Sequence, residues 1–286
     1  MYRSFYGLRD YPFGLSPDPR FLLLTPGVKE ALACLQHCVV RRSGFMVLVG
    51  EVGTGKTTLL RSFMDDLERR QSPFSYVFNP RLSVEEFLDY VLNDLEIPFE
   101  EHSKSHMLMC LNEWLLERYR AGQTTTLIVD EAQLLSDSAL EEIRLLTNLE
   151  TGQEKLLQIV LAGQPELAEK LAQGHLRQLR QRISLRCNLS PLTKEQTAEY
   201  VHRRLACVGA NGRTIFSDDA LEALYRYSAG IPRIVNTLCE HALIHGYVRE
   251  LRPIGGATIK EIAHEFDFGT GEQEQLAPTA SEPAEN

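Results

Sequence analysis

The chain has 286 residues, which suggests about two domains at roughly 150 residues each. Lys and Arg together number 30 and Asp and Glu 39, so the formal net charge is −9. This charge argues against a protein that coats nucleic acid, although it leaves room for a local basic patch.

The first forty residues combine prolines and glycines with interleaved aromatic residues. Disordered tails are poor in aromatic residues, so we expect an ordered segment here. We call the extended part before residue 28 the strap, and we predict a helix over residues 28–41. Residues 1–40 are expected to pack on the core as the strap and first helix.

From residue 41 onward, short apolar runs alternate with amphipathic segments. Expected strands cover residues 45–50, 75–79, 125–130, 157–163 and 183–189. Expected helices cover 56–70, a segment that begins at a Ser83/Glu86 capping box, 104–120, 137–150 and 165–180. The alternation predicts an α/β domain over 41–190, with a five-stranded parallel sheet covered by helices on both faces.

Only helices are expected after residue 190. Thr193 with Gln196, Ser217, Pro232, and Thr258 with Glu261 mark four helix starts in a small domain over 191–268. Residues 269–286 contain four Glu and no Lys or Arg, so we expect a disordered acidic tail. The tail carries −4 of the −9, which leaves −5 on the part expected to fold.

A phosphate-binding loop follows the first expected strand. Its residues match G-x-x-x-x-G-K-[ST] without exception: Gly50, Glu51, Val52, Gly53, Thr54, Gly55, Lys56 and Thr57. In this pattern the backbone N–H groups surround the phosphates at a helix N-terminus, Lys56 reaches the β- and γ-phosphates, and Thr57 ligates Mg²⁺. The nucleotide site is expected to extend to Thr58.

Adjacent carboxylates end the third expected strand, at Asp130 and Glu131. Two such carboxylates at the carboxyl end of a central strand are costly to place without a cation. We expect Asp130 to hold Mg²⁺, usually through water, and Glu131 to polarise the water that attacks the γ-phosphate. Together the two motifs predict an α/β P-loop NTPase that hydrolyses ATP with Mg²⁺.

The sequence resembles the AAA+ ATPases, and within them the bacterial ExeA/GspA-type secretion ATPases and the related MshM-type pilus biogenesis proteins. The segments that carry the resemblance are residues 5–8, 12–13, 16–21, 50–58, 130–133, 163–167 and 230–233. The resemblance implies an AAA+ core and a C-terminal helical lid. It covers about residues 1–268, and the short MshM-type members are the nearer comparison.

The resemblance also implies roles for residues outside the two motifs. Gln164 takes the place of a polar sensor of the γ-phosphate, and Arg233 that of an arginine which reaches the phosphates from the lid. Arg182 takes the place of an arginine finger that acts on a neighbour's ATP. Its neighbours Arg177, Arg180 and Arg186 leave that choice open, as does the alternative of a solvated basic face. Asn79, at the end of the second strand, is expected either to hold Glu131 in an inactive pose or to be an ordinary turn residue.

The function predicted from these features is ATP-driven assembly or remodelling of a secretion, pilus or surface-polymer export system. A trans-acting arginine implies an ATP-dependent homo-oligomer, and the expected partners are membrane-associated export or pilus assembly proteins.

The sequence contains neither the membrane helix nor the periplasmic peptidoglycan-binding domain of the larger secretion ATPases. No apolar run approaches the roughly 18 residues that span a bilayer, and the six cysteines form no Cys-x-x-Cys pair. We therefore expect a cytoplasmic protein that a partner recruits to the inner membrane.

Two other functions stay open. ATP-dependent DNA-binding regulators of transposition resemble the same P-loop and lid, and three basic stretches are available to line a nucleic-acid channel: residues 69–70, 177–186 and 202–204. A slow ATP-gated scaffold is the other alternative. Such a scaffold would differ from an ATPase that drives assembly or remodelling only in its slower rate of ATP turnover.

Overall fold

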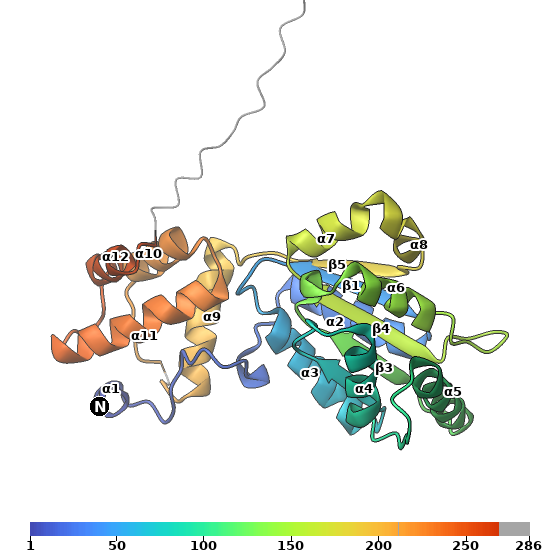
Figure 1. Cartoon of the computed structure of the whole chain (residues 1–286). Helices are drawn as coiled ribbons and strands as arrows, with labels where there is room; N and C mark the ends of the chain where they lie inside the picture. Colours follow the sequence, from blue (N-terminus) through green and yellow to red (C-terminus); the bar gives the residue numbers. More distant parts are fainter. Residues whose placement is uncertain (211, 269–286) are drawn as a thin grey trace, which may run out of the picture.

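The computed structural model describes residues 1–210 and 212–268. It has an α/β domain and a helical domain side by side, with the N-terminus next to the helical domain (Figure 1). The expected acidic tail, residues 269–286, lies outside the described residues. Within the described ranges no helix is both long and apolar enough to cross a membrane.

The α/β domain contains the predicted five-stranded parallel sheet, in the order β2-β3-β4-β1-β5. The strands are β1 (Phe45–Gly50), β2 (Phe74–Val77), β3 (Thr125–Val129), β4 (Leu157–Gly163) and β5 (Leu185–Leu189). The three central strands are buried along their whole length because helices cover both faces. Strands β2 and β5 form the edges and are shorter than predicted.

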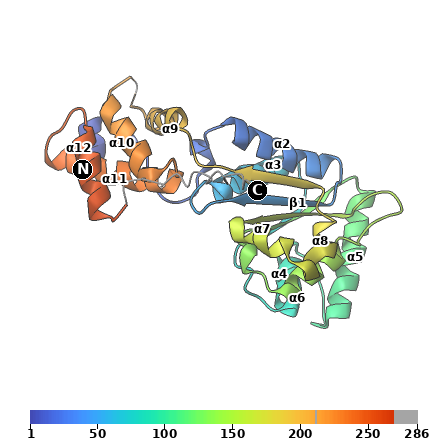
Figure 2. The ribbon, with the colours of Figure 1, turned by 90° about the horizontal axis from the view of Figure 1, so that it is seen from above.

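Two layers of helices enclose the sheet (Figure 2). One face packs against α2 (Pro26–Val40) and α3 (Lys56–Arg69). The other packs against α4 (Val84–Asp94), α5 (Lys104–Arg120), α6 (Asp137–Leu146), α7 (Pro165–Ala172) and α8 (Arg177–Arg180). The predicted capping box of Ser83 and Glu86 is present at the start of α4. Short 3₁₀ turns also occur at η1 (Pro19–Phe21), η2 (Ala132–Leu134) and η3 (Gly174–Leu176).

Two helix predictions in this domain were too long. The expected helix over 165–180 is divided into α7, η3 and α8. Gly174 opens η3, and glycine is a poor residue for a helix interior. The expected helix over 137–150 ends at Leu146, and Glu150 instead pairs with Lys155 in an isolated antiparallel bridge.

The helical domain consists of α9 (Lys194–Cys207), α10 (Asp218–Ser228), α11 (Pro232–Val248) and α12 (Gly256–Glu265). The predicted capping box of Thr193 and Gln196 is present. The predicted cap at Thr258 is wrong, because α12 begins at Gly256 and Thr258 is buried inside it. Asp219 takes the capping role, since its carboxylate accepts a hydrogen bond from the N–H of Gly256 at 2.7 Å.

The strap packs on the helical domain rather than on the sheet, whereas α2 packs on the sheet. Its short helix α1 (Tyr2–Tyr6) and its later aromatic residues join the core of the helical domain. Tyr2 donates to Glu240 at 2.7 Å, and Arg204 donates to the backbone of Pro12 at 2.5 Å. The strap therefore spans both domains, since Arg61 of α3 also donates to the carbonyl of Pro17 at 2.7 Å.

Candidate functional site

The phosphate-binding loop joins β1 to α3 at the carboxyl edge of the sheet. Gly53 and Gly55 have φ values of +81° and +99°, which residues with a side chain rarely adopt. The loop leads directly into α3, whose first N–H groups have no acceptors within the helix. This arrangement presents backbone donors and the positive end of a helix to an anion.

Lys56 is a buried cation without a counter-ion among the described residues. Its side chain is 5% exposed, and Nζ donates to the carbonyls of Gly50 at 2.7 Å and Glu51 at 3.0 Å. Burial lowers the pKa of Lys56, while the charges of Glu131 and Asp130 oppose that shift. A buried ammonium next to free helix N–H groups fits an anionic phosphate.

Thr57 and Asp130 form the pair of oxygen donors expected for Mg²⁺. Thr57 Oγ1 donates to Asp130 Oδ2 at 2.8 Å, and the N–H of Glu131 donates to Oδ1 at 2.9 Å. Asp130 is only 3% exposed. A buried carboxylate in contact with a hydroxyl, next to a phosphate-binding loop, fits a hard cation such as Mg²⁺.

Glu131 is held by two amide side chains. Gln133 Nε2 donates to Glu131 Oε2 at 2.6 Å, and Gln164 Nε2 donates to the same oxygen at 3.0 Å. Burial alone would raise the pKa of Glu131. The two amide hydrogen bonds and the charges of Lys56 and Arg233 outweigh burial and lower it. Glu131 is therefore an ionised carboxylate, available as a base once the amides release it.

Of the two alternatives for Asn79, the contact with Glu131 is not formed. Asn79 is exposed beyond the end of β2. Gln133 and Gln164, not Asn79, donate hydrogen bonds to the Glu131 carboxylate. The Gln133 side chain also accepts a hydrogen bond from the N–H of Gln164 at 3.1 Å. The two glutamines thus form a connected pair, and Gln164 lies beside Glu131.

Arg233 brings the helical domain to the phosphate-binding loop. Its N–H donates to the carbonyl of Gly53 at 3.2 Å. A Cβ on Gly53 would lie 2.7 Å from the Cβ of Arg233, so a side chain at Gly53 would force the loop or the start of α11 to shift. The exposed Arg233 lines the same cavity of about 190 Å³ as Lys56 and Glu131.

Arg182 lies at the amino end of the sheet, opposite the end that carries the phosphate-binding loop. It precedes β5, whose first residue, Leu185, pairs with Met46 near the amino end of β1. The phosphate-binding loop follows the carboxyl end of β1, so Arg182 is remote from the loop of its own chain. The four candidate arginines are all exposed: Arg177, Arg180, Arg182 and Arg186.

The sequence did not indicate three parts of this site, namely the strap, Arg204 and Tyr76. Residues 14–18 and 21–23 of the strap line the cavity, and Arg204 closes it from the helical domain. Arg204 is 5% exposed, lies 4.3 Å from the ring of Phe21 and donates to Tyr200 at 2.5 Å. It was grouped with the exposed His202 and Arg203 as a candidate DNA contact, and its burial rules that role out.

Tyr76 is the third contributor that the sequence did not indicate. Its hydroxyl donates to Asp130 Oδ2 at 3.1 Å. Burial, followed by the charge of Asp130, raises the pKa of Tyr76, so the hydroxyl stays protonated. Alternation along β2 is the one signal that could have suggested this contact, because Tyr76 lies on the face opposite the buried Ser75 and Val77.

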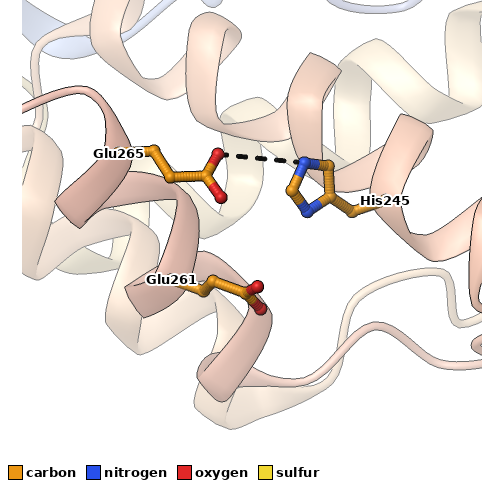
Figure 3. A group of neighbouring side chains, drawn as sticks. All are labelled: His245, Glu261 and Glu265. Carbon is orange, nitrogen blue, oxygen red and sulfur yellow. Dashed lines mark ion pairs between the residues drawn. The ribbon is translucent and has the colours of Figure 1, made fainter.

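A second cluster of potential metal ligands lies in the helical domain (Figure 3), and none of its residues lines the cavity. His245 of α11 faces Glu261 and Glu265 of α12, and its Nε2 lies 3.9 Å from Glu265. Both oxygens of Glu261 already accept hydrogen bonds from Arg249 at 2.6 Å. These contacts make the cluster an ion-pair network that joins the two helices.

Comparisons with known proteins agree with this architecture. Residues 40–171 match the family model described as AAA domain. General secretion pathway protein A of Aeromonas hydrophila is 41% identical over 93% of this chain and 48% of its own length. An uncharacterised HTH-type transcriptional regulator of Methanocaldococcus jannaschii is 24% identical over 71% of the chain and 45% of its own length. The chain thus spans about half the length of these curated relatives.

Solved structures share the fold at low sequence identity. Drosophila ORC bound to DNA matches 93% of this chain and 66% of its own, with a TM-score of 0.69 and 18% identity. Cdc6p of Pyrobaculum aerophilum matches 84% and 68%, with a TM-score of 0.65 and 19% identity. The RuvB branch migration motor of Thermotoga maritima matches 90% and 73%, with a TM-score of 0.59 and 19% identity. At this identity the likeness concerns the fold alone.

Proposed function

We propose that this chain, which belongs to the AAA+ ATPases of the General secretion pathway protein A type, hydrolyses ATP with Mg²⁺ to drive assembly or remodelling of a bacterial export system. The observation that carries the proposal is the convergence of Lys56, Thr57 and Glu131 at one cavity, with Asp130 hydrogen-bonded to Thr57 beside it. The secretion role draws on the relative's name. By the same analogy, the proposed partners are membrane-associated secretion, pilus or surface-polymer export proteins that recruit a cytoplasmic ATPase to the inner membrane.

Different residues at this site are proposed to bind the phosphates, to hold Mg²⁺ and to activate water. Lys56 and the N–H groups at the start of α3 bind the β- and γ-phosphates, and residues 50–58 surround them. Thr57 and Asp130 would hold Mg²⁺, which would neutralise the charge that develops on the phosphate oxygens. Glu131 orients a water molecule and takes its proton, a role suited to a carboxylate that is ionised at neutral pH.

Gln164 and Arg233 report the state of the nucleotide. Glu131 must leave its hydrogen bonds with Gln133 and Gln164 before it can act on water. A γ-phosphate near Gln164 offers that amide a new acceptor, which removes one of the two hydrogen bonds that hold Glu131. The exposed side chain of Arg233 lines the cavity from α11 and is proposed to bind the γ-phosphate. Loss of the γ-phosphate would then remove one contact between the domains and allow the helical domain to move.

Arg182 is proposed to complete the site of a neighbouring subunit in a homo-oligomer. Its exposure and its distance from the loop of its own chain support action in trans. We expect Arg182→Ala to reduce ATP hydrolysis by on the order of 10³-fold, as for other arginines that act on a neighbour's γ-phosphate. Mixing this variant with Glu131→Gln should restore activity, because intact Glu131 sites then meet intact Arg182 neighbours.

Phosphate release from the two variants, alone and mixed in equal amounts, measures this rescue. The matched control is Arg186→Ala, which removes an exposed arginine from the same edge and should leave hydrolysis unchanged. No rescue in the mixture, or rescue only of Arg186→Ala, contradicts the assignment of the finger to Arg182.

DNA binding is the second candidate function, and a specific feature favours it. Arg177, Arg180, Arg182 and Arg186 are all exposed along one edge of an otherwise acidic protein. If this edge binds phosphates of DNA, retention of duplex DNA with ATP should fall steeply between about 50 and 200 mM salt. We expect no retention even at 50 mM salt, and salt-sensitive retention that Arg186→Ala weakens would favour the DNA-binding function instead.

A further inference from the structure

Asp130 is fixed by three donors, and one of them comes from outside the two nucleotide motifs. Thr57 and the N–H of Glu131 belong to the expected metal and catalytic groups, whereas Tyr76 belongs to the edge strand β2. Thr57 and Tyr76 donate to the same oxygen, Oδ2, at 2.8 and 3.1 Å. A hydrogen bond to a buried carboxylate is among the stronger ones in proteins, so it can set the orientation of that group.

The backbone of Tyr76 is itself held in place. Because β2 is an edge strand, its outer N–H and C=O groups have no neighbouring strand to bind. Helix α4 supplies the partners: Asp94 accepts from the N–H of Tyr76 at 2.8 Å, and the Tyr90 hydroxyl donates to its carbonyl at 3.1 Å. On its inner side β2 pairs with β3, with Tyr76 opposite Ile128. The hydroxyl is thus presented to Asp130 from a fixed backbone position.

We propose that Tyr76 is a positioning residue for Asp130, which orients the carboxylate for Mg²⁺ and so sets how strongly Mg²⁺ promotes nucleotide binding. The inference rests on the proposed function, because it needs Mg²⁺ and a nucleotide at this site. It assigns Tyr76 no contact with the phosphates. If Thr57 served as a ligand of Mg²⁺ instead of donating to Asp130, Tyr76 would remain as the side-chain donor that keeps Oδ2 in place.

The test is Tyr76→Phe, which removes the hydroxyl and keeps the ring. Affinity for a fluorescent, non-hydrolysable ATP analogue is measured in EDTA and then across a Mg²⁺ titration. We expect the affinity in EDTA to stay unchanged, because Lys56 and the loop are intact. The Mg²⁺ concentration for half-saturation should rise about tenfold, the value of one hydrogen bond to a charged group.

The matched control is Tyr90→Phe, which removes a neighbouring hydroxyl that bonds to the Tyr76 carbonyl instead of to Asp130. It should change the Mg²⁺ requirement by less than about twofold, since the donor to Asp130 remains and the pairing with β3 and the bond to Asp94 still hold the backbone of Tyr76. An unchanged Mg²⁺ requirement in Tyr76→Phe overturns the inference, and so does an equal loss in both variants, because that loss would be structural. If Mg²⁺ does not strengthen nucleotide binding by the natural chain, the proposed metal site itself fails.

Discussion

Replacing Lys56 by alanine is expected to weaken ATP binding by at least about 100-fold, or roughly 3 kcal/mol, since a charge-assisted contact with the phosphates is lost. Lys56 is the cation that the loop encloses, and its pKa is lowered mainly by burial. A bound phosphate relieves that cost because it supplies the missing negative charge. The variant therefore loses attraction for the nucleotide while the helix N-terminus remains.

The measurement is calorimetric titration with ATP and Mg²⁺. Lys194→Ala serves as the matched control, because Lys194 is a surface lysine of α9 that pairs with Glu222. This control should bind ATP as the natural chain does. Circular dichroism and thermal melting check that Lys56→Ala is folded. Micromolar affinity in a folded Lys56→Ala protein would contradict the assignment of the phosphate site.

Replacing Glu131 by glutamine is expected to preserve ATP binding and to reduce hydrolysis by about 10²–10⁴-fold, the usual contribution of a general base. The substitution keeps the shape of the side chain but removes its negative charge. A neutral amide cannot take a proton from water. Since Lys56, Thr57 and Asp130 are unchanged, nucleotide and Mg²⁺ still bind.

Phosphate release and nucleotide binding are measured on the same preparation. Glu141→Gln is the matched control, because Glu141 is an exposed carboxylate of α6 that pairs with Arg144 away from the cavity. It should hydrolyse ATP normally. Size-exclusion chromatography with light scattering should find Glu131→Gln trapped with ATP as an oligomer. Hydrolysis at the natural rate by Glu131→Gln would contradict the role of Glu131.

The sheet and the two nucleotide motifs could be predicted because their signals are local. An apolar run, a glycine loop and a helix pattern are contiguous, so they fix β1, the loop and α3 together. The same holds for β3 and the carboxylates of Asp130 and Glu131. The boundaries were less accurate at the edge strands, where only one neighbour pairs with the backbone and the apolar signal is weaker.

Contacts between distant segments could not be predicted from such signals. Nothing local distinguishes Gln133 from Asn79 as the partner of Glu131, because the choice depends on the conformation after β3. There Glu131 adopts φ +52°, and Gln133 follows on the 3₁₀ turn η2. Arg204 likewise looked like part of a basic surface. The strap buries Arg204, which donates hydrogen bonds to the carbonyls of Pro12 and Gly14, about 190 residues away in sequence.

The most direct test of the central claim is a single-turnover assay, with excess protein and radiolabelled ATP, compared with a steady-state assay. We expect ADP and phosphate to form in both regimes with Mg²⁺, and neither to form in EDTA. Repeated turnover would separate a motor from a slow ATP-gated scaffold. If bound ATP stays intact in the presence of Mg²⁺, Lys56, Thr57, Asp130 and Glu131 form a nucleotide-binding site without hydrolytic activity, and the account is contradicted.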